Sequence, residues 1–284
     1  MNKIDFHIHS TNSDGALSLT QLIKLARKKK IPAIAITDHN KTYREIKKYS
    51  NIQGIELVSG IEITVTPPED VKELHVVGLF IDEKNKLLSE LSEKNRFQSI
   101  NTAKKIIKKI NEAGYKISFE ELEKETKGEH HGRPFMAKIL MRKYPEKFQE
   151  RYQVFDELLG QKGKAFVKPQ GTELQQAIKL IHNAGGIAII AHPWYLGDGM
   201  EKIINKFRSL GGDGIEVSCS RSKRIPRGME KKLRNIARKN KLVISGGSDF
   251  HGADSKDHNE EIGTRGISKK EFEYLKSYAL KKQK

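Results

Sequence analysis

The amino-acid sequence predicts an α/β protein with seven strands in a mostly parallel sheet or barrel that carries a helical insertion. Two observations predict this class. Apolar runs of strand length alternate with amphipathic helical segments over most of the 284 residues. Polar residues recur directly after these runs, where the active sites of β/α barrels form. Residues 83–170 interrupt the alternation, because they contain no convincing strand.

Seven apolar runs predict the strands. Because helical segments separate most of them, they predict a mostly parallel sheet or barrel. The predicted strands are residues 4–8, 33–37, 57–64, 74–81, 187–191, 214–218 and 242–245.

The helices are predicted from the residues that begin and end them. Ser18, with Gln21 three residues later, is typical of a capping box, and Pro32 ends the helix that follows. Glycine pairs end two of the later helices. Those later helices are predicted at residues 173–183, 201–210 and 228–240.

Residues 83–170 are predicted to form a helical insertion, so that residues 1–82 and 171–284 make the barrel domain. The insertion begins with a long basic helical pattern at 87–113, followed by shorter ones near 119–127 and 134–143. A lid that closes over the active site is one interpretation of such an insertion.

The composition favours an anionic partner and a cytoplasmic location. The chain has 53 Lys and Arg against 36 Asp and Glu, a net charge of +17, which attracts nucleotides, RNA or other phosphates. The lysines lie in short clusters, so solvated helix faces explain the charge equally well. No apolar run approaches the roughly 20 residues of a membrane span. A single cysteine, Cys219, and a first segment without an apolar leader favour a reducing cytoplasm.

Histidines and carboxylates recur at the predicted strand ends. His7 and His9 are two apart in a strand, so both imidazoles face one side and reach one ion. Asp14 follows in a turn-rich segment, and His39 follows the second apolar run. Glu62 lies inside a strand, where a carboxylate must be paired, solvated or bound to metal. The remaining candidates are His75, His192, Asp249 and His251.

Each of these residues alone has an ordinary structural explanation, but the set together favours a metal site. Six of the ten histidines belong to it. Imidazole and carboxylate ligands suit zinc, manganese or iron. Nine ligands exceed the needs of one ion, and a shared carboxylate such as Glu62 bridges two, so the set predicts two or three divalent metal ions.

These motifs together resemble the PHP family, the polymerase and histidinol phosphatase superfamily. The resemblance covers nearly the whole chain in the family's order. The resemblance implies a distorted, TIM-like β/α barrel of seven strands with a trinuclear metal centre. The matching motifs are Asp5-Phe6-His7-Ile8-His9-Ser10, Thr37-Asp38-His39-Asn40, Gly60-Ile61-Glu62, His75, Ala191-His192-Pro193 and Gly247-Ser248-Asp249-Phe250-His251.

The resemblance also implies which residues share an ion. One metal takes His7, His9, Glu62 and Asp249; a second takes Asp14, His39 and His251; a third takes Glu62, His75 and His192, with Glu62 bridging.

Two further features resemble a subgroup of stand-alone phosphoesterases that act on nucleotides and short RNA. Many relatives have histidine where this chain has Asp14, and the subgroup carries a Gly-Arg-Pro motif, matched here by 132–134. The predicted function is hydrolysis of phosphate esters by a metal-activated water. The substrates are 3′,5′-bisphosphate nucleosides, 5′-nucleotides, or short RNA degraded from its 5′ end. No catalytic group beyond the metal-bound water is predicted.

A guanidinium grips phosphate bidentately, so Arg133 is the first candidate for a phosphate-binding residue and Arg96 the second. An ordinary surface arginine is the alternative for each. The other histidines, His130, His131, His182 and His258, are interpreted as structural or solvent-exposed.

Three alternatives remain open from the sequence. A histidinol-phosphate phosphatase belongs to the same superfamily. An amidohydrolase also begins with His-x-His, but its bridging group is often a carbamylated lysine, and no lysine lies at a suitable strand end. A regulatory module with a degraded site is disfavoured because all nine ligands are present. The sequence does not indicate the oligomeric state.

Overall fold

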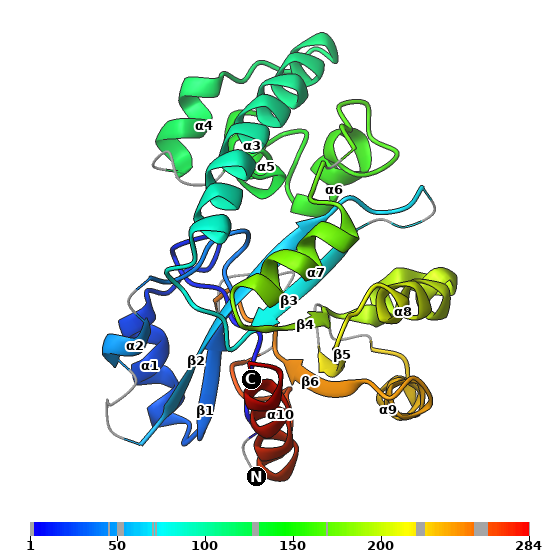
Figure 1. The fold of residues 1–284 in the computed structure, drawn as a ribbon. Helices are drawn as coiled ribbons and strands as arrows, with labels where there is room; N and C mark the ends of the chain where they lie inside the picture. The colour runs from blue at the N-terminus through cyan, green and yellow to red at the C-terminus, as the bar shows by residue number, and fades with distance from the viewer. Residues whose placement is uncertain are drawn as a thin grey trace. The chain divides into compact units, whose positions relative to one another are not determined.

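The computed structural model describes residues 3–44, 46–49, 54–69, 71, 73–126, 131–168, 170–219, 225–252 and 261–283. The chain divides into two compact units (Figure 1). The first, called the sheet unit, comprises Met1–Leu91 and Gly171–Lys284, and the second, called the helical unit, comprises Ser92–Gln170.

The sheet unit is built on a curled sheet of six strands that follow one another in chain order. The strands are β1 (Ala33–Ile36), β2 (Glu56–Val65), β3 (Leu74–Leu79), β4 (Ile187–Ile190), β5 (Gly214–Cys219) and β6 (Val243–Gly247). Three neighbouring pairs are parallel, whereas β3 runs antiparallel to both β2 and β4. The predicted α/β class and the mostly parallel pairing are confirmed, and six of the seven predicted strands are present.

The remaining predicted strand, residues 4–8 at the start of the chain, is not a continuous strand but an extended segment with isolated bridges. One reason is that the N–H of His7 donates to the Asp5 carboxylate (3.3 Å) and not to a neighbouring strand. The segment nevertheless bonds to both ends of the sheet: Ala35 N donates to Asp5 O (2.9 Å) and Phe6 N to Gly246 O (3.1 Å). It therefore lies between β1 and β6.

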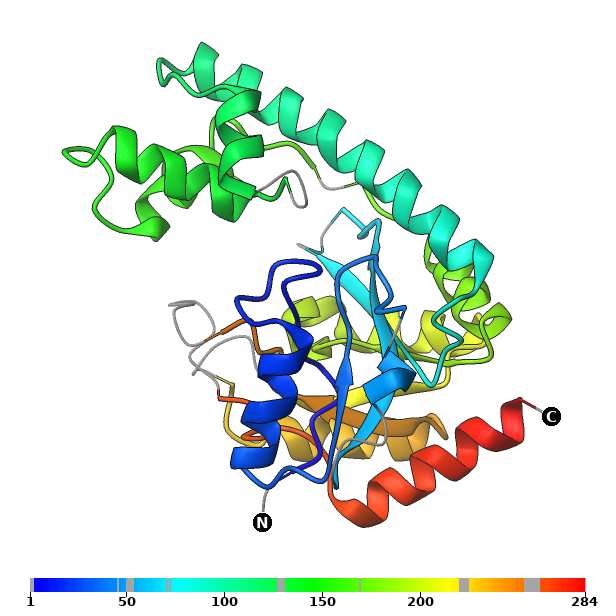
Figure 2. The ribbon, with the colours of Figure 1, turned by 90° about the vertical axis from the view of Figure 1, so that its left-hand side faces the viewer.

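Most strand residues are buried on both faces because helices cover the outside of the sheet. Every residue of β1, β3, β4 and β5 is buried. The predicted capping box of the first helix is confirmed, with Ser18 and Gln21 bonded in both directions. The last helix, which the sequence analysis did not predict, has the same device at Ser268. Figure 2 shows the first helix in blue and the last in red outside the strands. The helices of this unit are α1 (Leu19–Lys28), α2 (Ile46–Tyr49), α7 (Leu174–Asn183), the 3₁₀ segment η2 (Pro193–Gly199), α8 (Met200–Ser209), α9 (Met229–Lys239) and α10 (Lys269–Lys282).

The helical unit has its own apolar core and no strand among its described residues. Its core includes Ile110, Leu122 and Leu140, which are fully buried. The long helix α3 (Lys86–Glu112) begins in the sheet unit and continues into the helical unit. The helices are α3 (Lys86–Glu112), α4 (Phe119–Thr126), α5 (Arg133–Lys143), α6 (Arg151–Val154) and the π-helical turn η1 (Phe155–Leu159).

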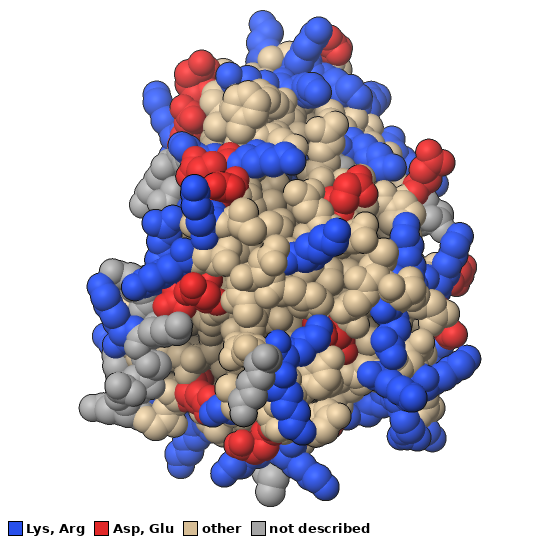
Figure 3. Space-filling model, viewed as in Figure 1, with Lys and Arg blue, Asp and Glu red and all other residues tan. Residues whose placement is uncertain are grey.

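The basic residues are scattered. On the face seen in Figure 3, Lys and Arg side chains extend from many places with Asp and Glu among them. In the part of the chain that is described, none of the helices is both long and apolar enough to cross a membrane.

Candidate metal centre

The fold brings the predicted ligands of distant sequence segments to one edge of the sheet. His39, His192 and Asp249 follow the carboxyl ends of β1, β4 and β6. His75 lies near the amino end of β3, and this end reaches the same edge because β3 runs antiparallel to its neighbours. Seven of the nine predicted ligands are buried, and Asp14 and His39 are partly exposed.

Glu62 is at the centre of this group, which we call the ligand cluster. Its Oε1 lies 2.9 Å from His75 Nδ1 and 3.1 Å from His192 Nε2. Its Oε2 faces different imidazoles: it lies 3.4 Å from His7 Nε2, 3.3 Å from His9 Nε2 and 3.0 Å from His39 Nδ1. The two oxygens of one carboxylate thus face two separate sets of nitrogens, as a bridging ligand requires.

Two aspartates complete the cluster around His9. Asp249 Oδ1 lies 3.1 Å from His9 Nε2 and 3.4 Å from His7 Nε2. Asp14 Oδ1 lies 3.5 Å from His9 Nδ1 and 3.4 Å from His251 Nε2. His9 therefore has a carboxylate beside each of its two ring nitrogens.

Four sets of side chains in the described chain place their ligand atoms within 4.8 Å of one another. The first is the set expected for one metal. The second contains the three residues expected for another metal, together with His9. The residues expected for the third metal are divided between the last two sets, one of which includes Glu73. The sets are His7, His9, Glu62 and Asp249; His9, Asp14, His39 and His251; His39, Glu62 and His75; and Glu73, His75 and His192.

The polar atoms of the cluster fit divalent cations. Among the described residues, several buried ligand atoms make no hydrogen bond of acceptable geometry although they lie close to one another: His7 Nε2, both ring nitrogens of His9, His39 Nδ1 and Glu62 Oε2. A buried polar atom without a partner is costly. Cations coordinated by these atoms would remove that cost, and imidazole with carboxylate is a donor set for zinc, manganese or iron.

The charges of the cluster support the same interpretation. Burial by itself raises the pKa of Glu62, but the imidazoles of His75, His7 and His39 lower it well below its ordinary value. Burial by itself lowers the pKa of His9, but Asp249 and Glu62 raise it to about 10. The Glu62 carboxylate is therefore ionised, and its charge attracts positive groups, whether a proton on an imidazole or a bound cation.

Burial and neighbouring charges also shift the pKa values of His7, Asp14 and His39. For His7, burial lowers the pKa, and the carboxylates of Glu216, Glu62 and Asp249 raise it well above its ordinary value. For Asp14, burial raises the pKa, and His251 and His39 lower it well below the ordinary value. The pKa of His39 is lowered, chiefly by burial.

The sequence model of the PHP domain family matches residues 5–184. The chain belongs to the PHP domain family. The resemblance noted in the sequence is confirmed, and so is the predicted enzyme class, a metal-dependent phosphoester hydrolase.

Relatives of this PHP chain match it over most of its length. It is 33% identical over 259 residues to the 5′–3′ exoribonuclease of Haemophilus influenzae, covering 88% of this chain and 90% of the relative. It is 30% identical over 257 residues to the 3′,5′-nucleoside bisphosphate phosphatase of Chromobacterium violaceum, covering 88% of each. A solved structure from Chromobacterium violaceum, named as an amidohydrolase with bound sulfate, superposes with a TM-score of 0.82 at 27% identity, covering 97% of this chain and 96% of that one.

The sequence analysis placed Asp5 and Asp38 in the motifs of the PHP chain but assigned them no role, and both hold loops that carry ligands. Asp38 accepts hydrogen bonds from Ser10 N (2.8 Å), Ser10 Oγ (2.7 Å) and Ser13 Oγ (2.7 Å), and so fixes the loop that carries Asp14. Asp5 accepts from Ser248 N (2.9 Å) and Ser248 Oγ (2.6 Å), beside Asp249. Both aspartates adjoin motif histidines, but sequence alone did not give their partners.

Two further carboxylates adjoin the cluster. Glu73 stands two residues before His75, the same spacing as His7 and His9, so it was detectable from the sequence. Glu216 lies inside the buried strand β5, as Glu62 lies inside β2, and the argument applied to Glu62 would have found it.

Two of the ligands have strained backbones. His192 has φ 30° and ψ 56°, and Asp249 has φ 53°, both in the left-handed region that non-glycine residues rarely adopt. Such strain concentrates at functional sites, where the surrounding structure enforces it.

The predicted phosphate-binding arginines belong to the helical unit, whereas the cluster belongs to the sheet unit. Within its unit, Arg133 Nη1 donates to Leu159 O (3.1 Å), and the guanidinium lies about 6 Å from the rings of Phe155 and Phe166. Burial lowers the pKa of Arg133. Arg96 is exposed. A role for either arginine in binding phosphate stays a prediction.

Histidines outside the predicted set have other partners where they are described. His131 is buried 3.7 Å from Glu123, and burial lowers its pKa. His182 Nε2 lies 2.7 Å from Asp213 Oδ2. The positions of His130 and His258 lie outside the described residues.

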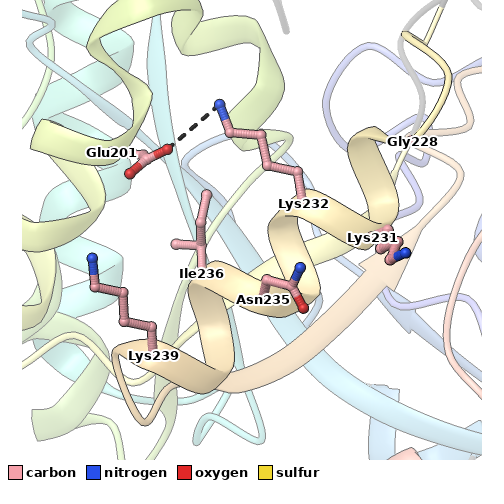
Figure 4. A pocket seen from close by; sticks show the side chains of 7 residues that line it. All are labelled: Glu201, Gly228, Lys231, Lys232, Asn235, Ile236 and Lys239. Carbon is pink, nitrogen blue, oxygen red and sulfur yellow. Dashed lines mark ion pairs between the residues drawn. The ribbon is translucent and has the colours of Figure 1, made fainter.

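A basic hollow lies on the surface between α8 and α9. Its lining includes Lys231, Lys232 and Lys239, against a single acidic residue, Glu201. Figure 4 shows Lys232 reaching across to Glu201, with which it forms an ion pair of 3.4 Å. The hollow has the open, lysine-lined character of solvated helix faces and does not include the ligand cluster.

Proposed function

We propose that this PHP chain hydrolyses phosphate esters of nucleotides or short RNA at the ligand cluster, with two or three divalent ions of manganese, zinc or iron. The observation that carries the proposal is the position of Glu62. Its two carboxylate oxygens face different histidines, which come from distant parts of the chain.

We assign the ions to three overlapping positions. Glu62 is shared by two of them, and His9 lies close to a second set besides its own. Glu73 is an additional candidate ligand at the third position. The positions are His7, His9, Glu62 and Asp249; Asp14, His39 and His251; and Glu62, His75 and His192.

Divalent ions supply an activated water and neutralise the oxygens of a phosphate. The protein's own contribution is to hold the ligands in a fixed, mostly dry arrangement. Asp14 and His39 have side chains exposed by 18% and 12%, more than the others of the cluster. A phosphate ester therefore approaches from the side of Asp14 and His39.

The names of the relatives support the substrate class. One is a 5′–3′ exoribonuclease and another a 3′,5′-nucleoside bisphosphate phosphatase, and each matches nearly the whole chain. We propose phosphorylated nucleotides or short RNA as the substrate, Arg133 and Arg96 as phosphate-binding residues, and residues 83–170 as an insertion that caps the site. The single cysteine, Cys219, supports action in the cytoplasm.

Amide hydrolysis is the second candidate, because a structural neighbour is named as an amidohydrolase. The usual bridging lysine of that class must be buried at the metals. Among the lysines whose side-chain exposure the structure describes, none is buried. Phosphate esters are therefore favoured over amides.

The test compares kcat/KM on a 3′,5′-bisphosphate nucleoside, a 5′-mononucleotide, a short 5′-phosphorylated RNA, histidinol phosphate and an amide. We expect turnover of nucleotides or RNA and none of the amide. His9→Ala removes a ligand and lowers kcat/KM on the nucleotide or RNA substrate by about 10- to 100-fold or more, the loss that follows removal of an outer-shell metal partner. His182→Ala, a histidine outside the cluster, is the matched control. Amide turnover, or full activity of His9→Ala, would refute the proposal.

A further inference from the structure

Glu216 is a buried carboxylate that contacts two histidines of the cluster without belonging to any of the four cation-binding sets. Its Oε1 lies 2.9 Å from His7 Nδ1, and its Oε2 accepts a hydrogen bond from His192 N at 2.6 Å. The side chain is fully buried. Glu216 therefore contacts these two histidines at atoms other than the ring nitrogens that face Glu62.

The first contact determines how His7 presents its ring. A neutral imidazole that donates from Nδ1 to Glu216 carries its lone pair on Nε2. Nε2 is the atom that faces the cluster, 3.4 Å from both Glu62 Oε2 and Asp249 Oδ1. A carboxylate behind a histidine ligand fixes the tautomer and the ring orientation and raises the basicity of the ligand.

The second contact holds a strained backbone. His192 occupies the left-handed region at φ 30°, immediately before η2 begins at Pro193. The bond from its N–H to Glu216 keeps the residue there, and its Nε2 consequently lies 3.1 Å from Glu62 Oε1. Without the carboxylate, a buried N–H would lose its partner at a residue whose conformation is already unfavourable.

The strand that carries Glu216 is locally irregular. The pairing of β5 with β6 changes register between Glu216 and Ser218. A β-bulge next to an active site redirects a side chain. The irregularity at this point is consistent with a carboxylate that must reach two partners on different segments.

We propose that Glu216 is a positioning residue of the metal centre: one carboxylate orients the ring of His7 and the backbone of His192, and so sets the cation affinity of two of the ion positions together. The inference rests on the proposed function only in taking the cluster to bind divalent ions. It concerns a residue that contacts ligands and is not itself a ligand.

The test measures metal binding directly, without substrate. Zn²⁺ affinity is determined by competition with a chromophoric chelator, and the visible spectrum of the Co²⁺-substituted protein reports the ligand geometry. Glu216→Gln keeps the shape but turns an NH₂ group toward one of the two donors. We expect a loss of Zn²⁺ affinity of about 10- to 100-fold, the range for outer-shell partners, and an altered Co²⁺ spectrum.

The matched control is Asp213→Asn. Asp213 is also buried, on the same stretch of chain, and it also accepts from a histidine ring, His182, and from a backbone N–H, that of Ala188. It lies outside the four cation-binding sets. We expect Asp213→Asn to lower the melting temperature of the metal-free protein while leaving the Zn²⁺ affinity and the Co²⁺ spectrum as in wild type.

Zn²⁺ affinity of Glu216→Gln within twofold of wild type would overturn the proposal. So would a loss of affinity that Asp213→Asn reproduces, since it would indicate general destabilisation. If Glu216→Gln does not fold, Glu216→Asp keeps the charge but shortens the reach, and unchanged affinity in that variant overturns the proposal. A wild-type protein that binds neither Zn²⁺ nor Co²⁺ refutes the proposed metal centre itself, a separate and recognisable result.

Discussion

Replacing Asp213 with asparagine removes a charge that holds several elements of the sheet unit together. The carboxylate accepts hydrogen bonds from Ala188 N and Tyr278 Oη, both at 2.9 Å, and it pairs with His182 and Lys282. These partners belong to β4, α10 and α7. In Asp213→Asn one oxygen becomes an NH₂ group that faces donors.

The size of the effect follows from burial. Breaking a buried ion pair costs about 3–5 kcal/mol. The side chains of His182 and Lys282 are 30% and 36% exposed, so water screens part of the interaction. We therefore expect a loss of about 2–3 kcal/mol in the free energy of unfolding. At about 2–4 °C per kcal/mol, the melting temperature falls by about 4–12 °C.

The pH dependence gives a second measurement. Burial by itself raises the pKa of Asp213, but the bonds from His182 and Lys282 lower it below its ordinary value. A carboxyl whose pKa is lowered by folding stabilises the protein above its unfolded pKa, near 4, and loses this contribution as the pH falls through the folded value. The gap in melting temperature between wild type and Asp213→Asn is therefore full at pH 5–7 and narrows below about pH 4.

Thermal unfolding of the metal-free proteins, followed by circular dichroism from pH 7 to pH 3, tests both expectations. A gap under about 1 °C at pH 7, where each kcal/mol corresponds to about 2–4 °C, would contradict the argument from burial. A gap that widens in acid would contradict the direction of the pKa shift.

Three further predictions concern metal and packing. Removing metal with a chelator abolishes hydrolysis and lowers the melting temperature, because ions present at 100 times their Kd stabilise the folded state by about 2.7 kcal/mol. Adding Mn²⁺ back restores both the activity and the melting temperature. A melting temperature that the chelator does not change would argue against a metal centre. In Gly247→Ala the new Cβ would lie 2.3 Å from His7 N, so the segment that carries His7 must shift. We expect titration calorimetry to show a metal affinity reduced by about tenfold or more, and wild-type affinity would refute this. Phe207→Ala empties a fully buried core position and costs about 3–5 kcal/mol in urea unfolding, with kcat/KM at 20 °C within about twofold of wild type.

The sequence predicted six strands well because most of their residues are apolar. In β3 and β5 every residue is buried, and such runs are visible without a structure. It did not predict that β3 runs antiparallel, although the short connection after β2 leaves no room for a crossover helix. The interrupted pairing of residues 4–8 depends on a side-chain bond from Asp5, which periodicity does not report.

The nine candidate ligands were predictable because their residue types are unusual at the ends of apolar runs. The carboxylates that hydrogen-bond to these ligands, or to the loops that carry them, were harder to predict. Glu216 and Asp38 contact residues that are distant in sequence, such as His7 at 209 positions from Glu216. Such partners follow from the register of the sheet, and the register shift between Glu216 and Ser218 changes it locally.

The position of residues 4–9 between β1 and β6 has a consequence for biosynthesis. Asp5 and Ser248, which are hydrogen-bonded, are 243 positions apart. At a translation rate of about 5–20 residues per second, the ribosome needs on the order of 12 to 50 s to make the intervening chain. Throughout that interval His7 and His9 are already synthesised while their partners Asp249 and His251 do not yet exist. The proposed ion positions that need Asp249 or His251 can therefore form only near the end of synthesis, whereas His7 and His9 can bind a metal ion without these partners before then.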